Sequence, residues 1–209
     1  MIVENKEIKF VQDWSEVTIA VWKELNSVES EYEISKKIEQ MSILTDTDPQ
    51  YIRSLSMKEF NEFSSKLGIL NKPLPREVVT TFKLGNKEYG IIPDFNYISA
   101  GEWIDAENWK DKPIDNIHLY AALIFRPIVS RDEDTWVIEP HTTTGFMTRA
   151  EKFERELPIS TIYGSVLFFS ALGIGLMKSL EESLTILQNP TEMKKMKKKR
   201  TSTATKKRK

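Results

Sequence analysis

The pattern of hydrophobic and polar positions divides this chain into a helical first third, a region of strand-like alternation and a long apolar segment near the end. In the first third, apolar residues recur every three or four positions, which is the spacing of one helix face. Asp48 before Pro49 is a helix cap followed by a proline at the first helical position, and Ser56 with Glu59 is a capping box. Gly68 is placed to end the last of these helices in a left-handed conformation. The pattern therefore predicts helices over 13–25, 31–44, 48–55 and 56–67.

From residue 78, apolar residues alternate with polar ones, which is the two-residue period of a half-buried β-strand. Two such runs, 78–84 and 87–92, are separated by Gly85 and Asn86, and a two-residue turn with glycine first predicts a β-hairpin. Because two strands alone are marginally stable, we expect a third strand or a helix to cover the apolar face of this hairpin. A shorter second hairpin is predicted over 128–129 and 136–138.

Helix signals surround these strands. Ser99 with Glu102 is a second capping box, and Thr148 with Glu151 is a third. An apolar helical run ends at Arg126-Pro127, because the residue before a proline disfavours the helical conformation. Helices are therefore predicted over 99–109 and 113–125, and from 148 to the start of the long apolar segment.

The longest apolar stretch, residues 157–177, has no charged side chain and decides the class of the protein. About 20 apolar residues suffice to cross a bilayer, so one membrane span over 157–177 is one interpretation. However, the apolar stripe on its helical face continues past the charged stretch 178–182, whereas a membrane span should end at its charges. We therefore favour a long amphipathic helix over 158–188 in a water-soluble fold. This helix holds three glycines that the close approach of another backbone would explain: Gly164, Gly173 and Gly175.

Together these elements predict a single, mainly helical α+β domain. Residues 1–70 would form a helical N-terminal portion, residues 71–190 the hairpin and the remaining helices with the long C-terminal helix, and residues 191–209 a disordered basic tail. The 209 residues suffice for one domain of ordinary size, and the hydrophobic content of 40% is that of a globular protein. The chain has no cysteine, and its charged first residues (MIVENKEIKF) do not indicate a secretory signal peptide.

The net charge of −1 conceals two regions of opposite sign. Residues 194–209 hold ten of the thirty basic residues and no acid, so the other twenty face thirty-one acids and give residues 1–193 a net charge of −11. A polycation of this kind binds polyphosphates by releasing their counterions, so contact with nucleic acid is an alternative function. Anionic lipid and the acidic body are the other ligands open to the tail. The residues proposed to bind nucleic acid are Lys194, Lys195, Lys197, Lys198, Lys199, Arg200, Lys206, Lys207, Arg208 and Lys209.

Little else in the sequence indicates chemistry. His118 lies on an otherwise apolar helical face, and His141 has no partner at the spacing of a metal-binding pair such as His-x-x-x-His. Glu102 and Asp105 are what the first turn of any capped helix contains. No nucleotide-binding loop and no nucleophile elbow occurs. We therefore expect no catalytic, cofactor-binding or metal-binding residue, and a protein that is not an enzyme.

Four stretches carry a resemblance to a known group: GNKEY at 85–89, ISAGEWID at 98–105, HLYAALIFRP at 118–127 and VLFF at 166–169. Together they resemble tailed-phage morphogenesis proteins of the tail-assembly-chaperone or small virion-component kind. The resemblance covers less than half of the chain and does not include the basic tail. It implies a structural or assembly protein, in the host cytoplasm or the virion, that binds other virion or assembly proteins without catalysis. We expect its contact surfaces at the edge of the first hairpin and on the exposed side of the last helix, and homo-oligomer formation stays open.

Overall fold

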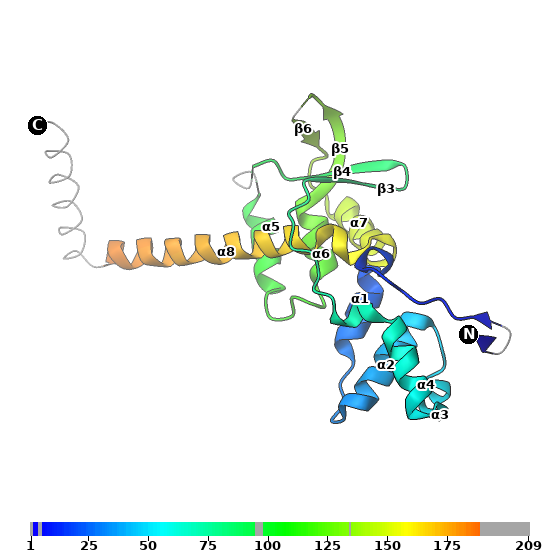
Figure 1. The fold of residues 1–209 in the computed structure, drawn as a ribbon. Helices are drawn as coiled ribbons and strands as arrows, with labels where there is room; N and C mark the ends of the chain where they lie inside the picture. The colour runs from blue at the N-terminus through cyan, green and yellow to red at the C-terminus, as the bar shows by residue number, and fades with distance from the viewer. Residues whose placement is uncertain (1, 4–5, 95–97, 134, 189–209) are drawn as a thin grey trace, which may run out of the picture. The chain divides into compact units, whose positions relative to one another are not determined.

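The computed structural model describes residues 2–3, 6–94, 98–133 and 135–188. This part of the chain holds eight α-helices and a four-stranded antiparallel sheet in the order β3-β4-β5-β6, which confirms the predicted α+β fold (Figure 1). By its internal contacts the chain divides into a compact unit of residues 1–167 and a second unit of residues 168–209. The sheet and the first seven helices belong to the first unit. The predicted division at residue 70 stays a prediction.

The N-terminal part is helical, as the hydrophobic periodicity predicts. Asp48 caps α3 by accepting a hydrogen bond from the Gln50 N–H at 2.8 Å, and Ser56 with Glu59 forms the expected capping box of α4. Most of the apolar positions predicted to face inward are buried, and Phe63, for example, is 1% exposed; Ile34, which the pattern also places inward, is wrong, because it is 56% exposed. With a short N-terminal ladder, the elements are β1 (Ile2–Val3), β2 (Lys6–Glu7), α1 (Ile19–Ser27), α2 (Glu33–Thr45), α3 (Pro49–Ser54) and α4 (Met57–Lys66).

Two predicted helix boundaries in this part are wrong. Asp13 caps only a short 3-10 turn (Trp14–Glu16), and α1 starts after Thr18. Gly68 is not a left-handed cap, because α4 leads into a second 3-10 turn that starts at Gly68. As the helix tightens, the Leu67 N–H donates to a carbonyl of the last helical turn. This carbonyl therefore needs no left-handed residue to satisfy it.

Both predicted hairpins are present, and β5 joins them into one sheet. Gly85 has φ of +60° and Asn86 is not left-handed, which is the pattern of a type II′ turn. Strand β5 directly follows the helix α6 (Ile117–Ile124) and pairs with both β4 and β6, so it is the third strand that the first hairpin required. The strands are β3 (Thr81–Leu84), β4 (Lys87–Ile91), β5 (Phe125–Arg131) and β6 (Trp136–Ile138).

The register of the strands gives the sheet two different faces. Phe82 opposes Tyr89, and both rings contact Phe153 of the helix α7 (Thr143–Glu156) at centroid distances of 5.6 and 5.0 Å. On the opposite face, the indole of Trp136 lies against Gly90, where a Cβ would be 2.5 Å from the indole Nε1. Glycine is therefore required at this position for the indole to lie across the sheet.

Three further helices are connected to the sheet: two lie between β4 and β5 in the sequence, and one follows β6. The capping box at 99–102 is confirmed, and α6 starts at residue 117 rather than 113 because a series of turns precedes it. The predicted capping box at 148–151 is wrong, because α7 already starts after Thr142, whose hydroxyl accepts a hydrogen bond from the Gly145 N–H at 3.2 Å. These helices are α5 (Ala100–Asn108), α6 (Ile117–Ile124) and α7 (Thr143–Glu156).

The long C-terminal helix is confirmed as α8 (Ile159–Gln188). A Cβ at Gly164 would lie 2.1 Å from the carbonyl oxygen of Glu77, so the close approach of another backbone is confirmed at this glycine. Beside it, the buried Ser165 hydroxyl accepts from the Val79 N–H at 2.9 Å and donates to the Val79 carbonyl at 2.8 Å. The helix thus fixes the linker that leads into β3. Across the described part of the chain, no helix combines the length and the apolar character needed to span a membrane.

Candidate functional site

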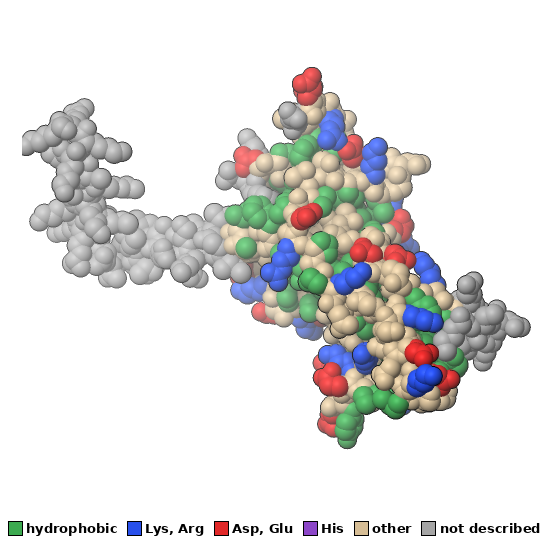
Figure 2. Space-filling model, viewed as in Figure 1, with side chains coloured by type: hydrophobic (Ala, Val, Ile, Leu, Met, Phe, Trp, Pro, Cys, Tyr) green, Lys and Arg blue, Asp and Glu red, His purple; other side chains and the backbone are tan. Residues whose placement is uncertain are grey.

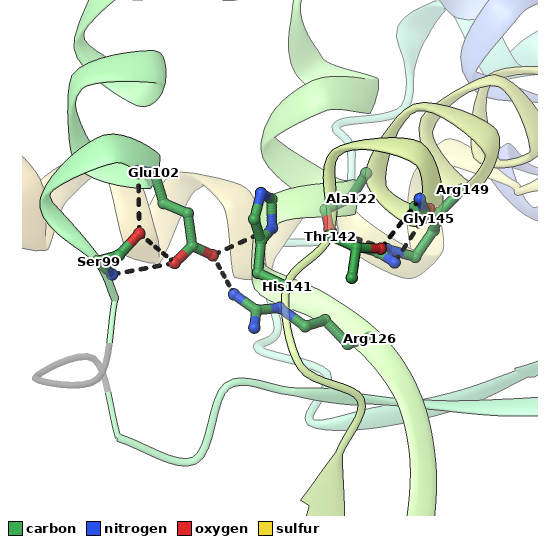
Figure 3. Close-up of polar contacts among 8 residues, drawn as sticks. All are labelled: Ser99, Glu102, Ala122, Arg126, His141, Thr142, Gly145 and Arg149. Atoms are coloured by element: carbon green, nitrogen blue, oxygen red, sulfur yellow. Dashed lines mark hydrogen bonds and ion pairs between the residues drawn. The ribbon is translucent and has the colours of Figure 1, made fainter.

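A buried ionic cluster lies where α5, β5 and the segment before α7 meet (Figure 3). Its centre is Glu102, which is 4% exposed. One carboxylate oxygen accepts hydrogen bonds from the N–H of Ser99 at 3.0 Å and from its hydroxyl at 2.7 Å. The other oxygen accepts from Arg126 and lies 3.3 Å from Nδ1 of His141. Glu102 therefore connects three separate parts of the chain.

The charge state of the cluster follows from these contacts. Burial raises the pKa of Glu102, but the hydrogen bonds from Ser99 and the charges of Arg126 and His141 outweigh burial and leave this pKa below its ordinary value. Burial lowers the pKa of Arg126, and the neighbouring Glu102 offsets part of this effect. At neutral pH the two side chains are a carboxylate and a guanidinium cation, which form an ion pair shielded from water.

Two nitrogen atoms of the cluster make no hydrogen bond. Among the buried side-chain nitrogen and oxygen atoms of the described residues, Arg126 Nε and His141 Nδ1 are the two without a hydrogen-bond partner. The contact between His141 and Glu102 is short but not aligned for a hydrogen bond, so its attraction depends on the protonation of the imidazole. The imidazole also lies against Phe146, at a ring-centroid distance of 5.7 Å, and keeps 26% of its side-chain surface exposed.

The order of the groups decides which chemistry this cluster can perform. In a Ser-His-acid triad, the imidazole lies between the hydroxyl and the carboxylate, so it can take the proton of the hydroxyl. Here the carboxylate of Glu102 lies between Ser99 and His141, and the Ser99 hydroxyl donates to that carboxylate. This order does not activate Ser99 as a nucleophile. Its effect is to hold α5 against the sheet.

A second buried arginine, Arg149 of α7, bonds the C-terminal end of α6. Arg149 of α7 donates from Nε and Nη2 to the carbonyl of Ala122 at 3.0 and 2.8 Å, and from Nη1 to the carbonyl of Gly145 at 3.2 Å. Carbonyls in the last turn of a helix lack partners within the helix, and a cation there also opposes the negative end of the helix dipole. Burial, followed by the charge of Arg126, lowers the pKa of Arg149 to about 10. Arg149 therefore remains a cation at neutral pH, and it caps α6.

His118 belongs to a separate ionic group that joins three helices. Its Nδ1 lies 3.5 Å from Nζ of Lys23 on α1, and its Nε2 lies 3.8 Å from the carboxylate of Glu154 on α7. Lys23 also donates a hydrogen bond to Glu154. Burial and then the charge of Lys23 lower the pKa of His118, although Glu154 opposes this shift. Protonation of His118 in acid therefore places a second cation beside Lys23.

Neither histidine takes part in a metal site within the described residues, where no three His, Asp or Glu side chains are grouped to hold an ion. An open depression of about 350 Å³ lies at the end of α2. It is wide open to solvent and mainly polar, unlike the enclosed apolar pockets that bind small molecules. Its lining consists of Glu24, Ser42, Ile43, Asp46, Thr47 and Asp48.

Two groups of exposed apolar side chains are candidates for contact surfaces. On the β5–β6 hairpin, Val129 and Val137 are 57% and 58% exposed; Val137 pairs with Ser130, and Val129 is the residue before it, at the bulge between Ile128 and Ser130. Figure 2 shows charged side chains where this hairpin ends and apolar side chains below them. Among the side chains of α8 that the structure describes, the large exposed apolar ones are Leu167, Phe168 and Leu172. Grouped apolar side chains of this kind mark interaction surfaces, whereas single ones do not.

The edge of the first hairpin, which we expected to be a contact surface, is partly closed. The backbone groups of Thr81 and Lys83 point away from β4, because the alternate residues bond to that strand. Val79 is the next residue with this orientation, and the Ser165 hydroxyl bonds both of its backbone groups. Only a short stretch of edge therefore remains open on β3.

The residues singled out in the sequence have different outcomes. The ten basic residues of 194–209 lie outside the described residues. The cluster of Glu102, Arg126 and His141 was missed, because the capping pattern already accounts for Glu102 and its partners are 24 and 39 positions away. One signal was present: Arg126 follows an apolar run, and an arginine buried there needs an acid.

Comparisons with protein-family models, with curated proteins and with solved structures find no match for this chain. The resemblance to phage morphogenesis proteins therefore stays a prediction. The same holds for the expected absence of catalysis.

Proposed function

We propose that this protein is a non-catalytic structural or assembly protein of a tailed phage that acts through protein–protein contacts in the host cytoplasm or the virion. The observation that carries the proposal is the exposed pair Val129 and Val137 on the β5–β6 hairpin. Strand β6 is a three-residue strand at the edge of the sheet. An edge strand such as β6 can pair with a strand of another protein, while Val137 on it and Val129 on the adjacent strand β5 fill pockets of that partner.

The hairpin is held in place before any partner arrives. The Trp136 indole donates to the carbonyl of Ile91 at 2.9 Å, and Arg131 forms a salt bridge with Glu88 of β4. Both contacts connect the hairpin to β4. Trp136 reaches it from β6, two strands away, and Arg131 reaches it from the adjacent strand β5. A surface fixed in this way loses little conformational entropy on binding, which favours affinity.

The test is a pull-down with the full chain from an extract of the cells that produce it, followed by mass spectrometry. The wild type should retain virion or assembly proteins, and the double variant V129K/V137K should lose them. Met57→Lys is the matched control, because Met57 is 62% exposed on α4 and receives the same new side chain. Failure of the wild type to retain any virion protein contradicts the proposal.

A second candidate function is contact with nucleic acid through the tail. It is favoured by the ten basic residues and the absence of acids in 194–209. Such binding should weaken steeply with salt and show no base preference, because the tail has no aromatic side chain to stack on bases. Deleting 194–209 should abolish binding to a labelled duplex, and unchanged binding would rule out this function for the tail.

A further inference from the structure

Strand β6 presents open backbone groups along its outer edge. The Thr135 carbonyl and the Glu139 N–H each form a hydrogen bond of 2.9 Å on the β5 side of the strand. Because alternate residues of an antiparallel strand bond to opposite sides, the backbone groups of Trp136 and Ile138 point away from β5. Among the described strands, β6 is the last one of its sheet, and none pairs with this side of it (Figure 1).

The side chains of this strand carry no charge. Its three residues, Trp136, Val137 and Ile138, are all apolar, and Val137 is 58% exposed. Native edge strands are commonly protected from pairing by a lysine, a proline or an inward-pointing charge within the strand. Strand β6 has none of these, so another strand can pair with it without burying an unpaired charge.

We propose that β6 pairs antiparallel with β6 of a second copy of this chain, about a two-fold axis at Val137. The inference rests on the proposed function, because it names the partner of the same hairpin surface. In this register Val137 lies opposite itself, and Trp136 lies opposite Ile138 of the second copy, so every apolar residue of the strand faces an apolar one. The open N–H and carbonyl groups of Trp136 and Ile138 bond to each other in both directions across the axis. The pairing joins the two four-stranded sheets into one continuous sheet.

The residues on either side of β6 leave one two-fold register for this pairing. Moving the axis to Ile138 places Pro140 opposite Trp136, where proline has no N–H to donate, and places the charged Glu139 opposite Val137. Moving the axis to Trp136 pairs residues that precede the strand, which begins at Trp136. An axis between two residues sets an outward-pointing backbone group against one that points toward β5.

Only the axis at Val137 therefore uses both open positions of the edge, Trp136 and Ile138. An edge that complements itself in one register fits a second copy, because a two-fold interface brings the same surface of both copies into contact.

The test places charges at the position that lies opposite itself. The mass of the purified full chain is measured by sedimentation at up to about 500 μM, because an interface built on so short a strand belongs to the small, weak class. The wild type should reach twice the chain mass of 24.3 kDa. Val137→Lys sets two cations opposite each other and Val137→Glu sets two anions, so each variant alone should raise the dissociation constant at least about 10-fold.

An equimolar mixture of the Val137→Lys and Val137→Glu chains should recover the dimer, because opposite charges then face each other across the axis. This recovery also shows that both variants are folded. Val78→Lys is the matched control, since Val78 is a 46% exposed valine that precedes β3 at the opposite edge of the sheet. It should dimerise as the wild type does.

A disulfide reads the register directly, because the chain has no cysteine and each introduced one is unique. Opposite residues at a position without ladder hydrogen bonds have Cα atoms about 4.5 Å apart, which a disulfide can span. Val137→Cys should therefore form a linked dimer on mild oxidation, and Val78→Cys should not. A monomeric wild type, a mixture of the charged variants that dimerises no better than each alone, or a Val137→Cys chain that forms no disulfide each overturns the proposal.

The result is separate from that of the pull-down, because the purified chain needs no virion protein to dimerise. A dimer that retains no virion protein contradicts the proposed function and leaves the pairing of β6 in place. A monomer that retains virion proteins supports the proposed function and overturns the pairing.

Discussion

The contact between α8 and the linker at Gly164 gives a prediction whose sign can be worked out from the structure. Alanine at this position would place its Cβ 2.1 Å from the carbonyl oxygen of Glu77. Carbon and oxygen atoms in contact normally stay about 3.3 Å apart, so the linker must move by more than 1 Å. That movement also separates Val79 from the hydroxyl of Ser165, which bonds both of its backbone groups.

Three effects add up to the expected change in the free energy of unfolding for Gly164→Ala. Forcing extra atoms into a packed site costs about 1–3 kcal/mol. Losing two hydrogen bonds of buried groups costs about 0.5–1.5 kcal/mol each. Alanine regains about 1 kcal/mol over glycine within a helix. We expect the free energy of unfolding to fall by about 1–5 kcal/mol.

Urea unfolding of the full chain, extrapolated linearly to water, measures this change. Gly101→Ala is the matched control, because it is also a glycine within a helix and a Cβ there would meet only the Ser99 hydroxyl, at 4.0 Å. Gly101→Ala should be neutral or stabilising by up to about 1 kcal/mol. If Gly164→Ala is as stable as Gly101→Ala, the reasoning about the linker contact is refuted.

Three further predictions concern the ionic groups and the sheet. Glu102→Gln leaves Arg126 as a buried cation without its counter-charge and should lower the free energy of unfolding by about 3–5 kcal/mol. The double variant E102Q/R126M should recover most of that loss, and a double-mutant cycle without coupling would contradict the ion pair. Because the pKa of His118 is lowered from 6.5, the unfolded chain takes up that proton first, so stability should fall as the pH drops below 6.5. His118→Gln should remove this part of the slope between pH 7 and 5, and an unchanged slope would show that another group causes it. Gly90→Ala should displace the Trp136 indole, lower stability by about 1–3 kcal/mol and shift the tryptophan fluorescence, and an unchanged spectrum would argue against their contact.

Elements whose signals are local could be predicted from the sequence. The capping boxes at Ser56 and Ser99 and the turn at Gly85 each depend on residues within four positions, and the structure has them all. The pattern at 148–151 is also local but wrong, because a threonine and a glutamate at this spacing inside a longer helix make no box. Helix α7 had already started after Thr142, which the pattern around 148 could not show.

The ionic cluster could not be predicted in this way. Its members come from α5, β5 and the segment before α7, and only the folded sheet brings them together. The sequence pattern predicts that Glu102 completes the capping box at the start of α5, which is correct, but it does not predict the ion pair with Arg126. Likewise, the glycine pattern of α8 indicated a close backbone, but the identity of that backbone, at Glu77, depends on how the linker crosses the helix.

The hydrogen bonds of the Ser165 hydroxyl have a consequence for when the edge of the sheet is closed during translation. All four strands of the sheet leave the ribosome before residue 165 does, because they end at Ile138. Until Ser165 is translated, the backbone N–H and carbonyl of Val79 lack the hydroxyl that bonds them, and the border of β3 is longer and open to other nascent chains. The border of β3 is therefore closed late in synthesis, by a helix that the ribosome makes after the sheet.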